Sequence, residues 1–176
     1  KSDVLMMKID STGNKQWLNY FGGKDNDFGY AITRSSDTGY AIVGETASYG
    51  NGKNDIWIIK TDRFGKKLWD SYLGGSGFDS GRSIDQTVDG GYIVCSTHDS
   101  HSYLIKTDGN GDSLWTKSYA FHDEKFFSVE QTTDGGYIVC GYTNPANADR
   151  NVYLMKTDGS GDTLWTKVYP GINGER

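Results

Sequence analysis

The chain has little proline, little cysteine and no long hydrophobic run. Only 2 of its 176 residues are proline and 2 are cysteine, and no apolar segment approaches the roughly 20 residues that a membrane-spanning helix needs. No stretch of ten residues shows helical periodicity, so a helical fold is not expected. The 18 basic and 23 acidic residues give a net charge of −5, and no basic surface indicates nucleic acid. Membrane insertion and nucleic-acid binding are therefore not expected.

Sequence motifs of catalytic, metal-binding and phosphate-binding sites are also missing, as are the features of an unprocessed N-terminus. The sequence contains no Gly-x-Ser-x-Gly nucleophile elbow, no His-Glu-x-x-His zinc motif and no phosphate-binding loop. It has no initiator methionine and no basic segment followed by an apolar leader, so we expect the true N-terminus to be missing or processed. An enzymatic function is thus uncertain and not the favoured interpretation.

What the chain does contain is a repeated unit rich in glycine and aromatic residues. Four tryptophans recur at separations of 52, 46 and 50 residues, and lysines and tyrosines keep the same phase. A fixed period near 50 is typical of a repeat architecture. We predict that the tryptophans and tyrosines form the structural core of each unit: Trp17, Trp69, Trp115, Trp165, Tyr40, Tyr92 and Tyr137.

The second copy, residues 55–98, illustrates the unit. "DIWIIKTD" and "KLWDSYL" have the pattern of strands joined by the turn "RFGK". "RSIDQTV" and "YIVCST" are a second pair joined by the tight turn "DGG". Four antiparallel strands in about 50 residues fit a propeller blade. Because such sheets pack face to face, both faces of the inner strands are buried, which explains apolar runs such as "WII" and "YIV".

The combined pattern, with "DIWIIKTD", "KLWDSYLGGSG" and "DGGYIV", resembles the bacterial and archaeal seven-bladed β-propeller repeat, SBBP. The resemblance covers nearly the whole chain. It implies that the "SI…DGGYIV" segment supplies the inner pair of strands and that the "DIWIIKTD…KLWDSYL" segment supplies the outer pair. It also implies a secreted or surface-attached protein, since the family is commonly extracellular and without assigned activity. A looser resemblance to quinoprotein propeller repeats rests on the Asp-x-x-Gly turns before Trp69, Trp115 and Trp165.

We therefore predict an all-β fold, a β-propeller of four-stranded antiparallel blades with about three and a half blades present. The expected divisions are an outer half-blade at 3–21, blades at 29–73, 80–119 and 126–169, and a connector at 170–176. Such a set of strands does not close a ring. We expect a segment of a longer propeller, whose partners are further blades from the same longer chain or from other copies.

The cysteines Cys95 and Cys140 occupy one repeat position, so they are expected to point the same way round the ring and not to face each other. The prediction is two small buried thiols without a disulfide.

One set of candidate site residues is acidic and repeated. Asp27, Asp79, Asp123 or Glu124, and Glu175 precede each innermost strand. At the mouth of a central channel they would form a ring of carboxylates for a cation or a basic ligand. The alternative is that each carboxylate accepts backbone N–H bonds in a glycine-rich loop and so sets the turn.

A second set is not repeated. His98, His101 and His122, with Asp99 and Asp123, lie in connectors expected on one face of the propeller. Imidazole and carboxylate together suit zinc or another transition metal. The alternative is a group of solvated loop residues, and no cofactor is the favoured expectation.

The turns beginning at Asp108 and Asp158 have calcium-like spacing but lack the glycine and the bidentate glutamate of a calcium loop. We interpret them as plain hairpin turns. Tyr49 and Arg150, in or beside the longest connectors, are the candidates for contact with a ligand.

Three functions remain open at this point. The first is a non-catalytic propeller scaffold of a secreted or cell-surface protein that presents loops for protein or glycan binding. The second is a segment of a metal- or cofactor-dependent propeller enzyme. The third is a self-assembling subunit of a surface layer or filament, joined through its uncovered blade edges.

Overall fold

Fourteen strands in the described residues form four antiparallel sheets. The computed structural model describes residues 1–98, 101–119, 125–143 and 150–170. The first sheet has two strands and the other three have four. The strands are β1 (Val4–Ile9), β2 (Lys15–Phe21), β3 (Asp27–Arg34), β4 (Tyr40–Thr46), β5 (Asp55–Thr61), β6 (Lys67–Leu73), β7 (Asp79–Gln86), β8 (Tyr92–His98), β9 (His101–Thr107), β10 (Ser113–Tyr119), β11 (Lys125–Gln131), β12 (Tyr137–Thr143), β13 (Asn151–Thr157) and β14 (Thr163–Tyr169).

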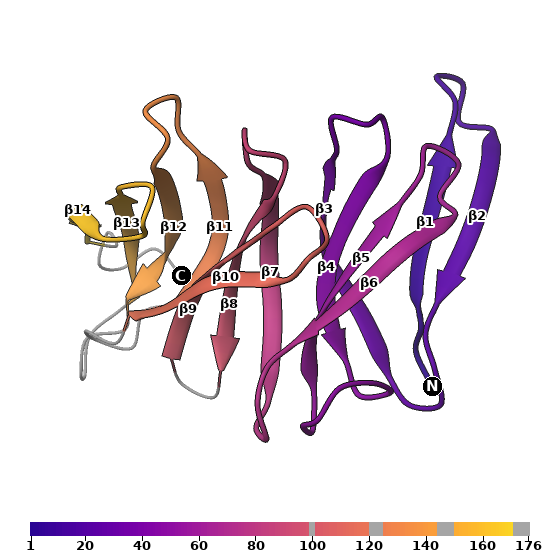
Figure 1. Ribbon diagram of the computed structural model, residues 1–176, viewed down its shortest axis with the longest axis horizontal. Coiled ribbons are helices and arrows are strands. Elements are labelled where there is room, and N and C mark those ends of the chain that lie inside the picture. The colour runs from indigo at the N-terminus through magenta and orange to yellow at the C-terminus, as the bar shows by residue number, and fades with distance from the viewer. Residues whose placement is uncertain (99–100, 120–124, 144–149, 171–176) are drawn as a thin grey trace.

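Each four-stranded sheet is a meander in which strands that are consecutive in sequence pair with each other. The sheets follow one another across the molecule in chain order, from β1–β2 at one end to β11–β14 at the other (Figure 1). This is a propeller-like arrangement, although within the described residues the sheets do not close into a ring. The predictions of an all-β fold and of four-stranded antiparallel sheets are confirmed. None of these residues forms a helix that would suit a bilayer crossing.

The hydrophobic core lies between sheets, in three clusters. One cluster joins β1 to β4 and β5, the next joins the β3–β6 and β7–β10 sheets, and the third joins the β7–β10 and β11–β14 sheets. Every residue of β5 is buried, because this strand has a neighbouring sheet on each face. The run "WII" is therefore buried on both faces, and Trp57 is among the largest fully buried side chains.

A three-part contact joins each sheet to the next. The ring centroids of Trp17 and Tyr40 are 6.3 Å apart, and those of Trp69 and Tyr92 are 6.1 Å apart. The turn between the outer strands of the later sheet covers the same tryptophan, because a Cβ on Gly65 would lie 2.6 Å from the Trp17 ring. The pattern recurs where Tyr137 and Gly161 meet Trp115. Side chains that repeat along the sequence thus hold neighbouring sheets together.

The prediction that all four tryptophans are core residues is wrong for Trp165. Trp17, Trp69 and Trp115 are half-buried and pack against the core clusters, whereas Trp165 is 42% exposed. The physical reason is that no described sheet lies beyond β14, so Trp165 has neither the tyrosine nor the glycine turn that covers the others.

The same reason accounts for the two cysteines. Both thiols are free, but Cys95 is buried and Cys140 is exposed. Cys95 lies in the cluster between its sheet and the next, whereas Cys140 is on the last described sheet. The expectation of two buried thiols is therefore wrong for Cys140.

In each four-stranded sheet, a buried lysine of the third strand binds the carboxylate in the turn of the inner hairpin. Lys106 donates to the carboxylate of Asp89, at 3.0 Å, and to the carbonyl oxygen of Thr107, at 2.7 Å. Burial opposes ionisation of Asp89, but hydrogen bonds from Thr87 and Lys106 lower its pKa to about 2. Equivalent pairs join Lys60 to Asp37 and Lys156 to Asp134.

Candidate ligand pocket

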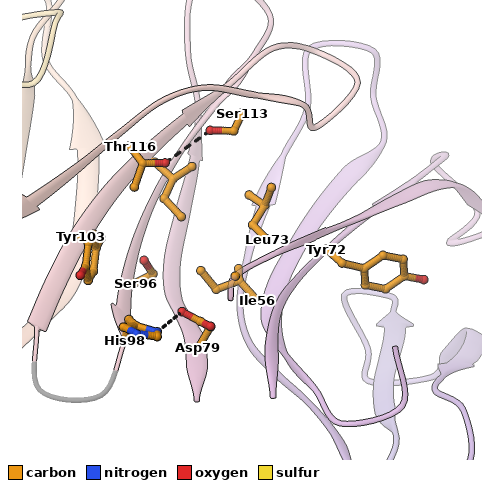
Figure 2. A pocket seen from close by; sticks show the side chains of 11 residues that line it. Ile56, Tyr72, Leu73, Asp79, Ser96, His98, Tyr103, Ser113 and Thr116 are labelled. Carbon is orange, nitrogen blue, oxygen red and sulfur yellow. Dashed lines mark hydrogen bonds and ion pairs between the residues drawn. The ribbon is translucent and has the colours of Figure 1, made fainter. Parts of the chain in front are cut away.

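A pocket of about 410 Å³ opens between the β3–β6 sheet and the β7–β10 sheet. The side chains of Ile56, Leu73 and Ile105 form apolar walls, and the hydroxyl-bearing residues Ser96, Ser113 and Thr116 also line it. Figure 2 labels Ile56, Leu73, Ser96, Ser113 and Thr116 around the opening between the two sheets. The volume lies within the range of about 300–1,000 Å³ that small-molecule sites occupy.

An Asp–His pair forms one edge of this pocket. Asp79 is the first residue of β7 and His98 is the last of β8, and the antiparallel register places them opposite each other. The Nδ1 atom of His98 lies 2.7 Å from Oδ1 of Asp79 (Figure 2). Asp79 is only 5% exposed, and its second oxygen accepts a hydrogen bond from the amide of Gly75 at 2.9 Å. The carboxylate therefore fixes the orientation of the imidazole.

A glycine-rich loop lets the backbone approach this pair closely. A Cβ on Gly77 would lie 2.7 Å from Cε1 of His98, and a Cβ on Gly74 would lie 2.7 Å from Oδ2 of Asp79. Residues larger than glycine would push the loop away from the carboxylate and the imidazole. The loop that joins β6 to β7 is thus shaped around the Asp–His pair.

Aromatic side chains line the pocket or adjoin it. Tyr103 of β9 packs edge-on against His98, with ring centroids 6.2 Å apart. The backbone of Tyr72 in β6 borders the pocket, but its ring points away from it (Figure 2) and packs against Trp57 and Tyr49. Its hydroxyl donates to Asp70 at 2.8 Å. Burial, followed by the hydrogen bond to this carboxylate, raises the pKa of Tyr72, so the phenol stays neutral.

The two described members of the acidic set behave as turn-forming residues. Asp27 is fully buried, and one of its oxygens accepts from the amide of Gly23 at 2.9 Å and from the hydroxyl of Ser48 at 2.8 Å. Asp79 likewise holds the loop before β7. These carboxylates are engaged with their own connectors, which favours the turn-setting interpretation. The remaining members, Asp123, Glu124 and Glu175, lie outside the described residues.

The histidine set falls only partly within the described residues. His98 and His101 are opposite each other in the β8–β9 hairpin, but His98 is paired with Asp79 and His101 is exposed. Asp99, His122 and Asp123 lie outside the described residues. Within the described ranges, no group of three or more histidine, cysteine, aspartate or glutamate side chains is placed to hold a metal ion. Zinc at this position therefore stays an untested hypothesis.

The two turns with calcium-like spacing are closed by their own aspartates. Oδ1 of Asp108 accepts hydrogen bonds from the amides of Asn110 and Asp112, at 2.8 and 3.0 Å. Asp158 makes the same bonds to the amides of Ser160 and Asp162. This geometry is that of a plain hairpin turn in which the aspartate caps the backbone.

The two ligand-loop candidates lie in connectors of different sheets. Tyr49 packs against Trp57 and Tyr72 and donates its hydroxyl to the carbonyl of Gly22 at 3.0 Å. The guanidinium of Arg150 lies 4.4 Å from the centre of the Tyr142 ring on the last sheet. Tyr49 therefore lies with Trp57 on the face of the β3–β6 sheet that packs against β1, away from the pocket, whereas Arg150 belongs to the far end of the molecule.

Most residues of the pocket carry no signal in the sequence. Ser96, Tyr103 and Thr116 are not among the predicted site residues, because each occupies an ordinary strand position and only the packing of two sheets brings them together. Asp79 and His98 are both predicted, but for different roles. The cross-strand register of β7 and β8 is the signal that pairs them.

Comparison with known proteins supports the fold and no particular function. No family profile matches the sequence, and no curated protein matches it. Among solved structures, a protein of unknown function from Bacteroides caccae is similar over 89% of this chain, with a TM-score of 0.52 and 11% sequence identity. The matched region spans 65% of that protein's length. At this level of identity the similarity concerns the fold alone.

Proposed function

We propose that the four-stranded sheets are blades of a β-propeller and that the chain is a non-catalytic binding module of a secreted or cell-surface protein. The resemblance to seven-bladed repeats and the face-to-face packing of successive sheets support the propeller interpretation. The pocket beside Asp79 and His98 supports a binding function. A rigid scaffold that presents a pocket between two repeats is a common way to build a binding site.

The chemistry of the pocket favours a neutral sugar as the ligand. Hydroxyl groups of a sugar require donors and acceptors, which the oriented imidazole of His98 and the hydroxyl-bearing side chains of Ser96 and Thr116 supply. The apolar face of a sugar ring suits an aromatic side chain, and Tyr103, which packs against His98, is in the lining. The observation that carries the proposal is this combination within one pocket of about 410 Å³.

The test is a titration of the chain with a panel of neutral mono- and oligosaccharides, in which binding is measured by calorimetry and by saturation-transfer NMR. Replacement of His98 by alanine removes a polar group from the pocket edge, and we expect it to weaken binding at least tenfold. His101→Ala is the matched control, because His101 is the exposed cross-strand neighbour of His98, and it should bind as the unmodified chain does.

Two results would count against the proposed function. One is the absence of binding to every neutral saccharide at millimolar concentration. The other is equal affinity in the His98→Ala and His101→Ala variants, which would place the ligand elsewhere. Thr116→Val, which keeps the side-chain volume and removes the hydroxyl, serves as a second variant if His98→Ala does not fold.

A further inference from the structure

The first sheet has an open backbone edge. Lys8 occupies the repeat position of Lys60, Lys106 and Lys156, so strand β1 is the counterpart of β5, β9 and β13. Each of those three strands pairs with a strand on both sides. Within the described residues, β1 pairs with β2 alone. Its other edge therefore presents unpaired backbone donors and acceptors, which are a template for a further strand.

An apolar groove of about 250 Å³ runs beside this edge. It is formed by β1 and by the facing residues of the next sheet, and its lining is Val4, Leu5, Met6, Met7, Gly29, Tyr30, Ala31, Ile32 and Ile42. Several of these are largely uncovered: Leu5 is 54% exposed, Met7 52% and Ile32 54%. Apolar side chains around an unpaired edge favour a strand with its own apolar face as the occupant.

The repeats indicate which kind of strand fits. In the three four-stranded sheets, the lysine equivalent to Lys8 is bound by the carboxylate in the turn of the inner hairpin, at 2.7–2.9 Å. The glycine before the hairpin tyrosine allows this approach, because a Cβ on Gly39 or Gly91 would lie 2.1 Å from a carbonyl oxygen of the third strand. Among the residues that the structure describes, Lys8 has no carboxylate of this kind.

Among the described residues, Trp165 at the other end of the molecule has no tyrosine from an inner hairpin packed against it. Elsewhere, each tryptophan of this series packs against the tyrosine that follows the hairpin glycine, with ring centroids 6.0–6.3 Å apart. Lys8 and Trp165 thus lack two different contacts that one kind of hairpin supplies in the rest of the described structure.

We propose that the open edge of β1 binds an antiparallel β-hairpin of the repeat's inner type, with an Asp-x-Gly turn whose carboxylate pairs with Lys8. The occupant is an additional hairpin and not a second folded copy of this chain. Every inner hairpin of the described chain, β3–β4, β7–β8 and β11–β12, is already paired within its own sheet. This inference goes beyond the proposed ligand pocket, which lies between other strands, so either can fail without the other.

The probe is a synthetic hairpin with the sequence of residues 81–97, carrying Cys95→Ser to prevent oxidation. We expect it to bind the full chain and to protect amides of β1 from hydrogen exchange. Asp89→Asn in the peptide, or Lys8→Met in the chain, should weaken binding at least tenfold. Lys15→Met is the matched control, because Lys15 is an exposed lysine of the adjacent strand β2, and it should leave binding unchanged.

Isolated two-stranded hairpins are only marginally stable in water. A second form of the experiment therefore joins the same hairpin ahead of Lys1 through a flexible linker, which raises its effective concentration to the millimolar range. The tethered hairpin should raise the thermal midpoint of the chain, and Asp89→Asn within it should reduce that gain.

Three outcomes would overturn the proposal. Unchanged exchange at β1 with both the peptide and the tethered hairpin would show that the edge does not accept a strand. Equal effects of the aspartate and asparagine hairpins would show an unspecific apolar contact. Self-association of the chain through β1, with no competition by the hairpin, would make a second copy the occupant.

Discussion

Gly91 and Gly90 are adjacent glycines of the β7–β8 turn in which alanine meets two different obstacles. A Cβ on Gly91 would lie 2.1 Å from the carbonyl oxygen of Thr107 and 2.6 Å from Nζ of Lys106. A Cβ on Gly90 would have nothing within 4 Å, but its backbone has a φ of +86°. Gly91→Ala therefore tests close packing, and Gly90→Ala tests backbone strain alone.

The expected costs differ because the obstacles differ. Alanine in the left-handed region costs about 1–2 kcal/mol, and the lower entropy of the unfolded chain returns about 0.4–1 kcal/mol of this. Gly90→Ala should thus lower the free energy of unfolding by about 1 kcal/mol. Forcing an atom into a packed site costs about 1–3 kcal/mol, and each disturbed hydrogen bond to a charged group costs about 1.5–3 kcal/mol. We expect Gly91→Ala to cost about 3–4 kcal/mol in total.

The assay is equilibrium unfolding in urea, followed by tryptophan fluorescence, with the two variants compared at the same pH and salt. Unchanged slopes would show that the free energy of unfolding is compared between similar folded and unfolded states. A cost for Gly91→Ala that does not exceed the cost for Gly90→Ala would refute the reasoning. In that case the contact between the hairpin turn and Lys106 would not constrain the glycine.

Three shorter predictions rest on burial and charge. Trp69→Ala should lower the free energy of unfolding by about 3 kcal/mol, and by at least about 1 kcal/mol more than Trp165→Ala, in the same urea assay. Burial raises the pKa of Cys95 to about 12, so iodoacetamide should label Cys140 in the folded chain and spare Cys95, as peptide mass analysis would show. Because folding lowers the pKa of Asp89 to about 2, its contribution to stability is present above the unfolded pKa of about 4. This contribution should be lost as the pH falls from about 4 to about 2, and unfolding of the Asp89→Asn variant should depend less on pH across that range.

Local sequence predicted the strands well, because the signals for them are local. A turn residue such as Gly65 reflects local backbone geometry, and the apolar run around Trp57 reflects a buried strand. Both signals can be recognised from a few consecutive residues. These signals recur in each copy, and they led to the correct sheet type.

The burial of individual side chains could not be predicted in the same way, because it depends on whether another sheet packs against the face that carries them. Cys95 and Cys140 both follow "YIV", yet one is buried and the other exposed. Trp69 and Trp165 share the motif "LW", but among the described sheets only Trp69 has a neighbour that covers it. The position of a unit within the array decides these outcomes, and a single unit does not encode its position.

The candidate site depended on register for the same reason. Asp79 and His98 are 19 positions apart, and they meet only because β7 and β8 pair with the ends of the hairpin aligned. Residue type marked each as a candidate, but the partner of each came from strand pairing, which the sequence pattern did not specify.

The tryptophan–tyrosine–glycine contact has a consequence for how such a protein changes over generations. Each unit contains the residues for both of its contacts. Its tryptophan packs against the following sheet, and its tyrosine and glycine turn pack against the tryptophan of the preceding sheet. A tandem duplication of about 50 residues therefore inserts a new unit together with a compatible joint on each side. Loss of a unit likewise leaves its two former neighbours able to meet. Gene length and unit number can change while the joint itself is retained.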